Sequence, residues 1–209
     1  FLGVLVMIPG AGAAAVSFEA VSKHLPDVTA NIQPNASSRI YDDKGRLITT
    51  VHAEENRIPV PITEVPQNLQ NAFVAAEDVR FYEHHGIDPR GILRAVWNNV
   101  LSRNATGQGG STITQQLARN AFLTQEQTLK RKLLEVVLAL QIENKYTKKQ
   151  ILEMYMNQIY FGQGCYGIQT ASRVYFGKDV KDLTLPQCAM LAGLPNSPNY
   201  YSPFRSLEA

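Results

Sequence analysis

Apolar residues recur at every third or fourth position through most of the chain after residue 67, which is the spacing of amphipathic helices. The two clearest stripes are Leu129, Leu133, Val136, Val137 and Leu140, and Ile151, Leu152, Tyr155, Met156 and Ile159. Two further helices are predicted, one over Asn71–Glu83 and one that begins at the cap-then-proline pair Asp88-Pro89. The pattern therefore predicts a mainly helical domain over residues 61–209.

Four threonines are each followed three residues later by glutamine, which is the capping-box pattern at the start of a helix. The pairs are Thr112/Gln115, Thr124/Gln127, Thr147/Gln150 and Thr184/Gln187. Before the helical region, Arg39–Val51 shows the pattern of a β-hairpin around the turn at 42–45. We therefore interpret residues 19–60 as a linker and a small N-terminal hairpin.

The first eighteen residues contain no charged side chain, and the first eight are strongly apolar. This is typical of the end of a transmembrane helix or signal anchor, so residues 1–18 are predicted to be a truncated anchor. A buried helix of a larger domain would show the same pattern, and that alternative stays open. Since the chain does not begin with Met, we expect further sequence upstream.

Composition narrows the class of protein. Of the 209 residues 44% are hydrophobic, which excludes a disordered chain. The net charge of +2 argues against a nucleic-acid binder, which usually has a strong basic excess. Cys165 and Cys188 lack the spacing of a metal site and are predicted to be buried free thiols.

The charge is unevenly distributed along the chain. Residues 1–88 carry a net charge of −5, residues 89–149 carry +7, and the remainder is neutral. The middle third could therefore attract an anion, although solvated helix faces produce the same count.

Three stretches could carry chemistry. Glu77 stands beside aromatic and basic residues near a predicted helix end, where a carboxylate can serve as a general base. The run at 109–116, Gly-Gly-Ser-Thr-Ile-Thr-Gln-Gln, places a glycine loop before a helix N-terminus, which can hold a phosphate. Arg131, Lys132 and Glu135 share one helix face. An ordinary charged helix end, a capped helix and a solvated face are the simpler interpretations of the three.

Together these stretches resemble one family. The order E-D-x-x-F-x-x-H-x-G, G-G-S-T-x-T-Q-Q, R-K-x-x-E, I-L-x-x-Y-x-N-x-x-x-x-G and A-S-x-x-Y-F-G-K resembles the peptidoglycan glycosyltransferases, over roughly residues 38–205. These enzymes form the N-terminal domain of class A penicillin-binding proteins and also occur alone. The resemblance implies a lysozyme-like, two-lobed helical fold. It also implies an inverting transfer that polymerises lipid II into β-1,4 glycan and releases undecaprenyl pyrophosphate.

The resemblance also implies roles for individual residues. Glu77 matches the general base on the acceptor hydroxyl, and Glu135 matches a second catalytic carboxylate on the donor side or in support of the leaving group. The positions implied to bind substrate are Asp78, Phe81, His84, Ser111, Thr112, Gln115, Gln116, Arg119, Asn120, Arg131 and Lys132. The family usually has Lys at the position of Arg119, and Arg keeps the charge and binds phosphate bidentately.

The implied partners are lipid II, the growing glycan strand and the lipid bilayer, with no nucleic acid. The implied location is the extracytoplasmic face of the bacterial inner membrane, on a single-pass anchor. No cofactor is expected, while a divalent cation, Mg²⁺ or Mn²⁺, at the pyrophosphate stays open, as does a downstream transpeptidase domain. We also predict that Ile92, Leu93, Val96, Trp97, Leu101 and Phe122 form a hydrophobic flap that touches the bilayer.

Two rival functions remain at this point. A lytic transglycosylase or muramidase would share the fold and also use a glutamate. The basic cluster at 119–132 argues against it, because a neutral glycan needs no such charge. A non-catalytic scaffold domain is the second rival, and the presence of both Glu77 and Glu135 argues against it.

Overall fold

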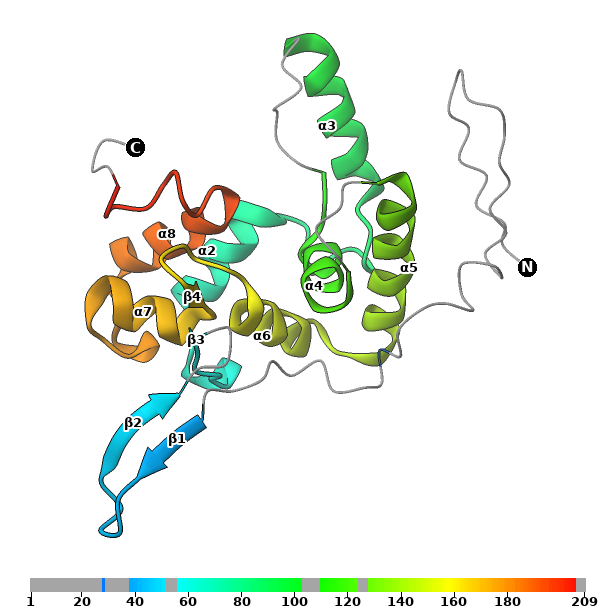
Figure 1. Ribbon diagram of the computed structural model, residues 1–209. Coiled ribbons are helices and arrows are strands. Elements are labelled where there is room, and N and C mark those ends of the chain that lie inside the picture. Colours follow the sequence, from blue (N-terminus) through cyan, green and yellow to red (C-terminus); the bar gives the residue numbers. More distant parts are fainter. Residues whose placement is uncertain (1–27, 29–37, 52–55, 103–109, 124–127, 206–209) are drawn as a thin grey trace.

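A computed structural model describes residues 28, 38–51, 56–102, 110–123 and 128–205, and within these the chain is mainly helical (Figure 1). The α-helices are α2 (Gln67–Glu77), α3 (Pro89–Ser102), α4 (Ile113–Phe122), α5 (Leu129–Lys145), α6 (Lys148–Gln158), α7 (Ile168–Phe176) and α8 (Leu185–Gly193). Short 3-10 turns cover Ile62–Glu64, Val180–Asp182 and Leu194–Asn196. The mainly helical class predicted from the apolar period is confirmed.

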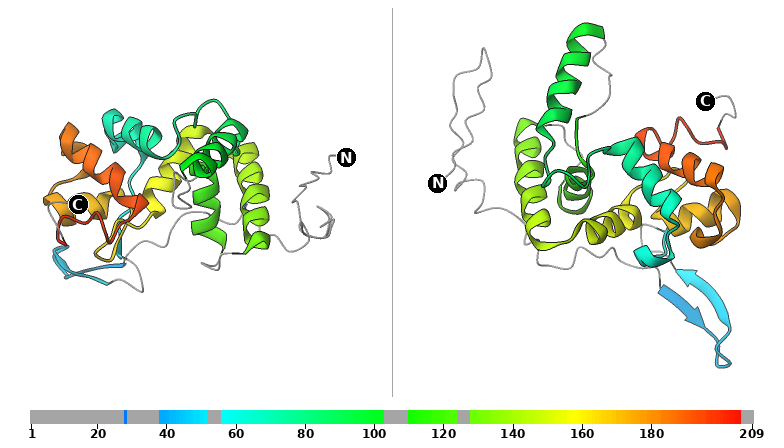
Figure 2. Two further views of the ribbon diagram at one scale, coloured as in Figure 1. Left: turned by 90° about the horizontal axis from the view of Figure 1, so that it is seen from above. Right: turned by 180° about the vertical axis from the view of Figure 1, so that it is seen from behind.

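Helix α6 lies in the middle of the helical domain (Figures 1 and 2). It packs against α4 and α5 on one side and against α7 on the other, while α2 packs against α8. Helix α6 buries side chains around most of its circumference, as its position between two groups of helices requires. The second apolar stripe predicted from the sequence therefore belongs to the innermost helix.

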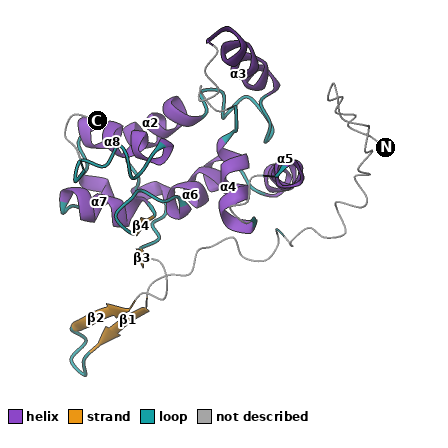
Figure 3. Cartoon of the chain, turned by 45° about the horizontal axis from the view of Figure 1, so that its top comes forward, coloured by secondary structure: helices purple, strands orange, loops and turns teal. Residues whose placement is uncertain are grey.

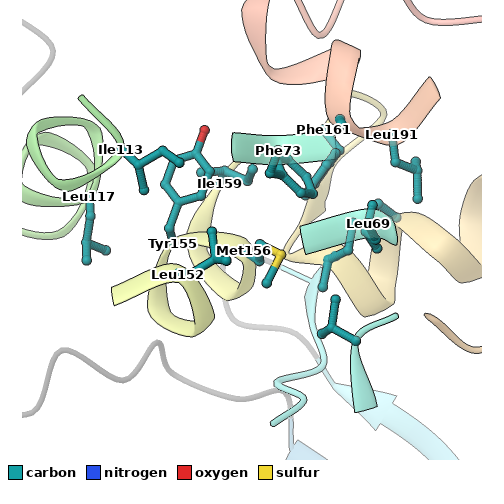
Figure 4. Close-up of a cluster of buried hydrophobic side chains, with 14 of the residues drawn as sticks. Leu69, Phe73, Ile113, Leu117, Leu152, Tyr155, Met156, Ile159, Phe161 and Leu191 are labelled. Carbon is teal, nitrogen blue, oxygen red and sulfur yellow. The ribbon is translucent and has the colours of Figure 1, made fainter. Parts of the chain in front are cut away.

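The buried core joins α2, α4, α6 and α8 (Figure 4). Phe73 of α2 contacts Tyr155 of α6 and Phe161 edge to face, each at a ring-centroid distance of 6.1 Å. Leu152 and Met156 are fully buried beside them. Burial of a side chain of this size contributes about 1.5–3 kcal/mol, so these contacts hold the two groups of helices together.

Strands are confined to two short pairs in the described part of the chain (Figure 3). Strands β1 (Ser38–Tyr41) and β2 (Leu47–Val51) pair antiparallel, and Asp42 accepts hydrogen bonds from Arg46 across the turn. Strands β3 (Asn56–Arg57) and β4 (Cys165–Tyr166) pair in parallel. The second pair was not anticipated, because two residues are too few to show a period.

Capping residues fix where several helices begin. Thr112 and Thr147 form the predicted capping boxes at α4 and α6, and the side chain of Gln187 accepts from the backbone N–H of Thr184 at α8. The predicted box at Thr124 lies outside the described residues. Helix α5 begins one turn later than that box would place it, where the Thr128 hydroxyl accepts from the backbone N–H of Arg131 at 3.1 Å.

The helix predicted over Asn71–Glu83 was wrong at both ends, since α2 spans Gln67–Glu77. The backbone leaves the helix at Asp78, with φ −158° and ψ 77°, and residues 79–86 form turns and a bend. The reason is tertiary, because the Asp78 carboxylate accepts a hydrogen bond from the backbone N–H of Ile113, which lies 35 residues further along the chain. The predicted start at Asp88-Pro89 is confirmed by α3.

An ion pair fixes the start of α3. Nε and Nη2 of Arg80 donate to Oδ2 of Asp88 at 3.1 and 2.6 Å. Burial pushes the pKa of Asp88 up, but the hydrogen bonds from Arg80 and the backbone of Gly91 outweigh it, so the pKa lies below its usual value. The pair should therefore stabilise the fold most when Asp88 is ionised.

We expect Asp88→Asn to lower the melting temperature at pH 7 by about 2–4 °C. A carboxyl whose pKa is lowered in the folded state stabilises the protein above the unfolded-state pKa, which is about 3.9. That contribution is lost as the pH falls through the folded-state value. Thermal unfolding of both proteins from pH 7 to pH 2.5 should show the two curves converging below about pH 4. A constant difference across this range would show that the charge is not involved.

Both cysteines are buried and free, as predicted, and burial raises the pKa of each thiol. Among the described residues, no helix is both long enough and apolar enough to cross a bilayer. The predicted anchor, residues 1–18, lies outside the described residues, as does most of the predicted linker.

Candidate active site

Glu77 is the last residue of α2 and is half-buried. Its Oε2 accepts a hydrogen bond from Nε2 of Gln116 on α4 at 2.8 Å. Gln116 in turn accepts through Oε1 from the hydroxyl of Tyr155 on α6, at 3.3 Å. The predicted general base is thus held from a second helix, and it is not sealed from solvent.

Asp78, the next residue, is buried and has different partners. Its carboxylate contacts Nε2 of His84 at 2.9 and 3.0 Å, and it accepts from the backbone N–H of Ile113 at 3.0 Å. Asp78 and His84 therefore tie the turn after Glu77 to the first residue of α4. Their burial makes them supports of the site and leaves little surface for a substrate.

A second bond joins the same two segments. The hydroxyl of Thr112 donates to the carbonyl of Gly86 at 2.6 Å. Gly86 has φ +87°, and a Cβ there would lie 3.0 Å from the carbonyl oxygen of Ala139, so glycine alone fits this close approach. Gln115 is also committed, because its buried side chain accepts from the backbone N–H of Thr112.

Phe81 was predicted to bind substrate, but its side chain is fully buried. The ammonium of Lys148 lies 4.5 Å from the centre of its ring. Lys148 also pairs with Glu143 at 2.7 Å, and Glu143 accepts from the Thr114 hydroxyl at 2.5 Å. Phe81 therefore supports the site as a buried packing residue. Its ring contacts Lys148, which belongs to an ionic cluster with Glu143 that the apolar pattern did not predict.

Glu135, on α5, is 1% exposed and engages both neighbouring cations. Oε1 accepts from Nη1 of Arg131, and Oε2 lies 2.9 Å from Nζ of Lys132. Lys132 also donates to the hydroxyl of Ser111 at 2.6 Å. Both carboxylate oxygens of Glu135 are therefore engaged by cations, so the side chain holds Arg131 and Lys132 in place and has no oxygen left open for a substrate hydroxyl.

The two carboxylates therefore belong to two clusters, and these meet at the start of α4. Ser111 contacts the Lys132–Glu135 pair, and Thr112 and Ile113 contact the segment after Glu77. Arg119, one turn beyond Gln116, is half-buried, and Asn120 is exposed. The start of α4 brings together carboxylates, hydroxyls and cations that are far apart in the chain.

Within the described residues, no group of three or more His, Cys, Asp or Glu side chains could hold a metal ion. The oxygens of Asp78 and Glu135 are already engaged by His84, a backbone N–H and two cations. Of the predicted catalytic carboxylates, Glu77 is the more open one. The described residues of this site therefore do not provide a set of protein ligands for a divalent cation.

Sequence reasoning missed Tyr155 as a site residue. It was assigned to the apolar stripe of α6, and its ring is indeed fully buried. Its hydroxyl donates to the side-chain amide of Gln116 on α4. A tyrosine in an otherwise aliphatic stripe was the available signal, because a buried hydroxyl usually requires a partner.

Comparison with known proteins agrees with the motifs. A family model described as Transglycosylase matches residues 44–209. Penicillin-binding protein 1F of Bacillus subtilis is 52% identical over 169 residues, which cover 81% of this chain and 23% of that protein. Penicillin-binding protein 1A of Escherichia coli is 46% identical over 209 residues, which cover 99% of this chain and 24% of that protein.

A crystal structure of penicillin-binding protein 1A from Haemophilus influenzae aligns with 84% of this chain and 16% of that chain. The sequence identity is 26% and the TM-score is 0.43, which is too low to argue a shared fold. The present chain spans only 23% and 24% of the length of the two curated relatives above.

The matches define the class as a peptidoglycan glycosyltransferase domain, of the kind found in class A penicillin-binding proteins. Within that class the chain belongs to the transglycosylase family. The resemblance inferred from the five motifs is therefore confirmed.

Proposed function

We propose that this domain polymerises lipid II into β-1,4 glycan strands by an inverting transfer that releases undecaprenyl pyrophosphate. The observation that carries the proposal is that two different carboxylates are both linked to α4 and the residues just before it, Glu77 through Gln116 and Glu135 through Lys132 and Ser111. One is half-buried and reaches solvent, and the other is buried between two cations. These are the two elements that an attack by a hydroxyl on a pyrophosphate-linked sugar requires.

Glu77 suits the role of general base on the acceptor's 4-hydroxyl. It lies at the end of a helix and one of its oxygens is held by Gln116, so the carboxylate has a defined orientation. A positioned base typically contributes about 10²–10⁴-fold to the rate. The hydroxyl would lose its proton to Glu77 as its oxygen attacks the anomeric carbon of the donor.

The leaving pyrophosphate needs positive charge more than it needs a proton. Arg131 and Lys132 supply that charge, and Glu135 fixes both side chains in place. Preorganised cations stabilise developing negative charge without reorganising during the reaction. Arg119, which stands where the family usually has lysine, would add a further cation. In this assignment Glu135 acts through the cations and the proton transfer falls to Glu77.

We propose the lysozyme-like, two-lobed arrangement for the domain, with α2, α7 and α8 in one lobe and α4 and α5 in the other. The proposed location is the outer face of the bacterial inner membrane, on an anchor at residues 1–18. The lengths of the relatives support a longer protein in which a transpeptidase domain accompanies this one.

Helix α3 supports the proposed contact with the bilayer, because it stands away from the other helices and carries exposed apolar side chains (Figures 1 and 2). Leu93 is 70% and Trp97 is 67% exposed, and Ile92 is also exposed. Phe122, predicted for the same flap, packs against the core instead. The side chains of Val96 and Leu101 lie outside the described residues.

We expect the double substitution Leu93→Ser and Trp97→Ser to weaken binding to liposomes by about tenfold or more, because two large apolar side chains no longer leave water. The measurement is liposome co-sedimentation of protein lacking residues 1–18. Leu185→Ser, at a 61% exposed leucine on α8, is the matched control and should bind like the parent. Equal binding by all three proteins would show that α3 does not contact lipid.

Incubation with purified lipid II, and separately with finished cell wall, tests the proposed function. Glycan polymer from lipid II supports it. Soluble fragments from cell wall, with no polymer from lipid II, would establish the lytic rival. The absence of both products would favour the non-catalytic scaffold. A parallel reaction with a chelator tests whether a divalent cation takes part, because loss of polymer there would show that one is required.

A further inference from the structure

The hydroxyl of Tyr155 is a polar group at the edge of an otherwise apolar contact. The ring is fully buried on α6 and packs edge to face against Phe73, with an interplanar angle of 85° (Figure 4). Phenylalanine would satisfy this packing. A buried hydroxyl costs free energy unless it makes a hydrogen bond, so the partner of this hydroxyl indicates what it does.

That partner is the side-chain amide of Gln116. The Tyr155 hydroxyl donates to Oε1 of Gln116 at 3.3 Å, and Nε2 of the same amide donates to Oε2 of Glu77 at 2.8 Å. An amide has an acceptor at one end and donors at the other. A donor at the Oε1 end therefore keeps the NH₂ end toward Glu77, whereas the reversed amide would set two acceptors against each other.

The hydroxyl keeps its proton at every pH relevant to the reaction. Burial raises the pKa of Tyr155 well above its ordinary value, and the negative charge of Glu77 raises it further, while Arg119 opposes both. Tyr155 is therefore a constant donor. It cannot become a second anion beside the base.

We propose that Tyr155 is a positioning residue for Glu77, which it orients by fixing the side-chain amide of Gln116. This inference rests on the proposed function, because it takes Glu77 as the base of the glycosyl transfer. It also assigns Gln116 to the support of that base, where the resemblance implied a substrate contact. Helices α2, α4 and α6 would then each contribute one side chain to a single series of hydrogen bonds that orients Glu77 (Figure 1).

Tyr155→Phe tests this role, because it keeps the ring and removes only the donor. We expect kcat for lipid II polymerisation to fall about tenfold, which is the factor that one net hydrogen bond represents, with KM changed less than twofold. Hydrogen bonds in a catalytic network are often long before substrate binds, as the 3.3 Å bond is here.

Tyr175→Phe is the matched control. Tyr175 is half-buried, and its hydroxyl likewise donates a hydrogen bond, at 2.8 Å, but to the backbone carbonyl of Phe161 and not to a residue that contacts Glu77. We expect this variant to keep kcat and KM within twofold of wild type. Both variants should melt within about 2–4 °C of the wild type. If the loss of activity in each variant were explained by its lower melting temperature alone, Tyr155 would have only a packing role.

A double-substitution cycle with Gln116→Met shows whether Tyr155 acts through the amide. We expect Gln116→Met to lower kcat, and the addition of Tyr155→Phe to change it by less than twofold more, since the amide to be oriented is gone. Fully additive effects, or a rise in KM at unchanged kcat, would overturn the inference.

The proposed function and the role of Tyr155 can be tested separately. A wild-type protein that makes no polymer from lipid II would end the proposed function, and the inference with it. A wild type that makes polymer, beside a Tyr155→Phe variant of equal kcat, would end the inference alone.

Discussion

Glu77→Gln is expected to abolish lipid II polymerisation while the protein stays folded. The amide has the shape of the carboxylate and can still accept from Gln116, but it cannot take a proton from the acceptor hydroxyl. The loss of a general base costs about 10²–10⁴ in rate. Because Glu77 is half-buried at a helix end, we expect the melting temperature to change by only a few degrees, within about 2–4 °C. Polymer formation and thermal unfolding measure the two effects.

Glu83→Gln is the control for this experiment. Glu83 is an exposed carboxylate in the turns that follow Glu77. Its substitution by glutamine removes the same charge from a nearby position in the chain. We expect it to polymerise like the wild type. Should Glu77→Gln retain activity close to that of Glu83→Gln, the base would have to be another group and the proposed mechanism would be wrong.

Glu135→Gln is expected to reduce both stability and activity. It removes the one anion between two cations, and Nε of Arg131 is already buried without a hydrogen-bond partner among the described residues. Breaking a buried ion pair usually costs about 3–5 kcal/mol. Lys132 is 45% exposed and can turn to water, so we expect a smaller loss of stability than that, about 2–3 kcal/mol. That corresponds to about 5–10 °C in melting temperature.

The activity of Glu135→Gln should fall by about 10²–10³, which is the usual effect of losing one preorganised group that stabilises the transition state. The reason is that Arg131 and Lys132 would no longer be held for the pyrophosphate. Initial rates at a temperature well below the melting point, where all of the protein is folded, separate this effect from unfolding.

Glu143→Gln separates stability from chemistry. Glu143 is also a buried carboxylate on α5, and it is paired with Lys148 and with the hydroxyl of Thr114. We expect a comparable loss of stability and near-normal rates for the folded protein. Equal rate losses in the two variants would mean that Glu135 supports the fold and has no particular link to the leaving group.

Glu77 and Glu135 look alike in the sequence, because each has a basic residue three or four positions away on a predicted helix. Their surroundings make them different. Glu77 meets an amide and solvent, whereas Glu135 meets a guanidinium and an ammonium and is closed off. Both oxygens of Glu135 are occupied by cations, whereas Glu77 is half-buried and reaches solvent, where an acceptor hydroxyl could approach it. The prediction that both are catalytic is therefore refined to one proposed base and one proposed anchor of cations.

The sequence by itself determined the helical class, the start of most helices and the identity of the family. Apolar period and capping act over three or four residues, so they are written locally in the chain and survive in any packing. The starts of α3, α4 and α6 followed from such local signals. Each family motif is equally local, because it is a short run of neighbouring residues.

Only the tertiary structure decided where α2 ends, which predicted site residues are buried, and what holds Glu77. Helix α2 stops at Glu77 because Asp78 bonds a backbone group 35 residues away. Gln116 is 39 residues from Glu77, and Tyr155 is 39 residues from Gln116. No local pattern encodes such distances, because they arise only when α2, α4 and α6 pack around one core, and that packing converts an apolar-stripe tyrosine into a neighbour of the proposed base.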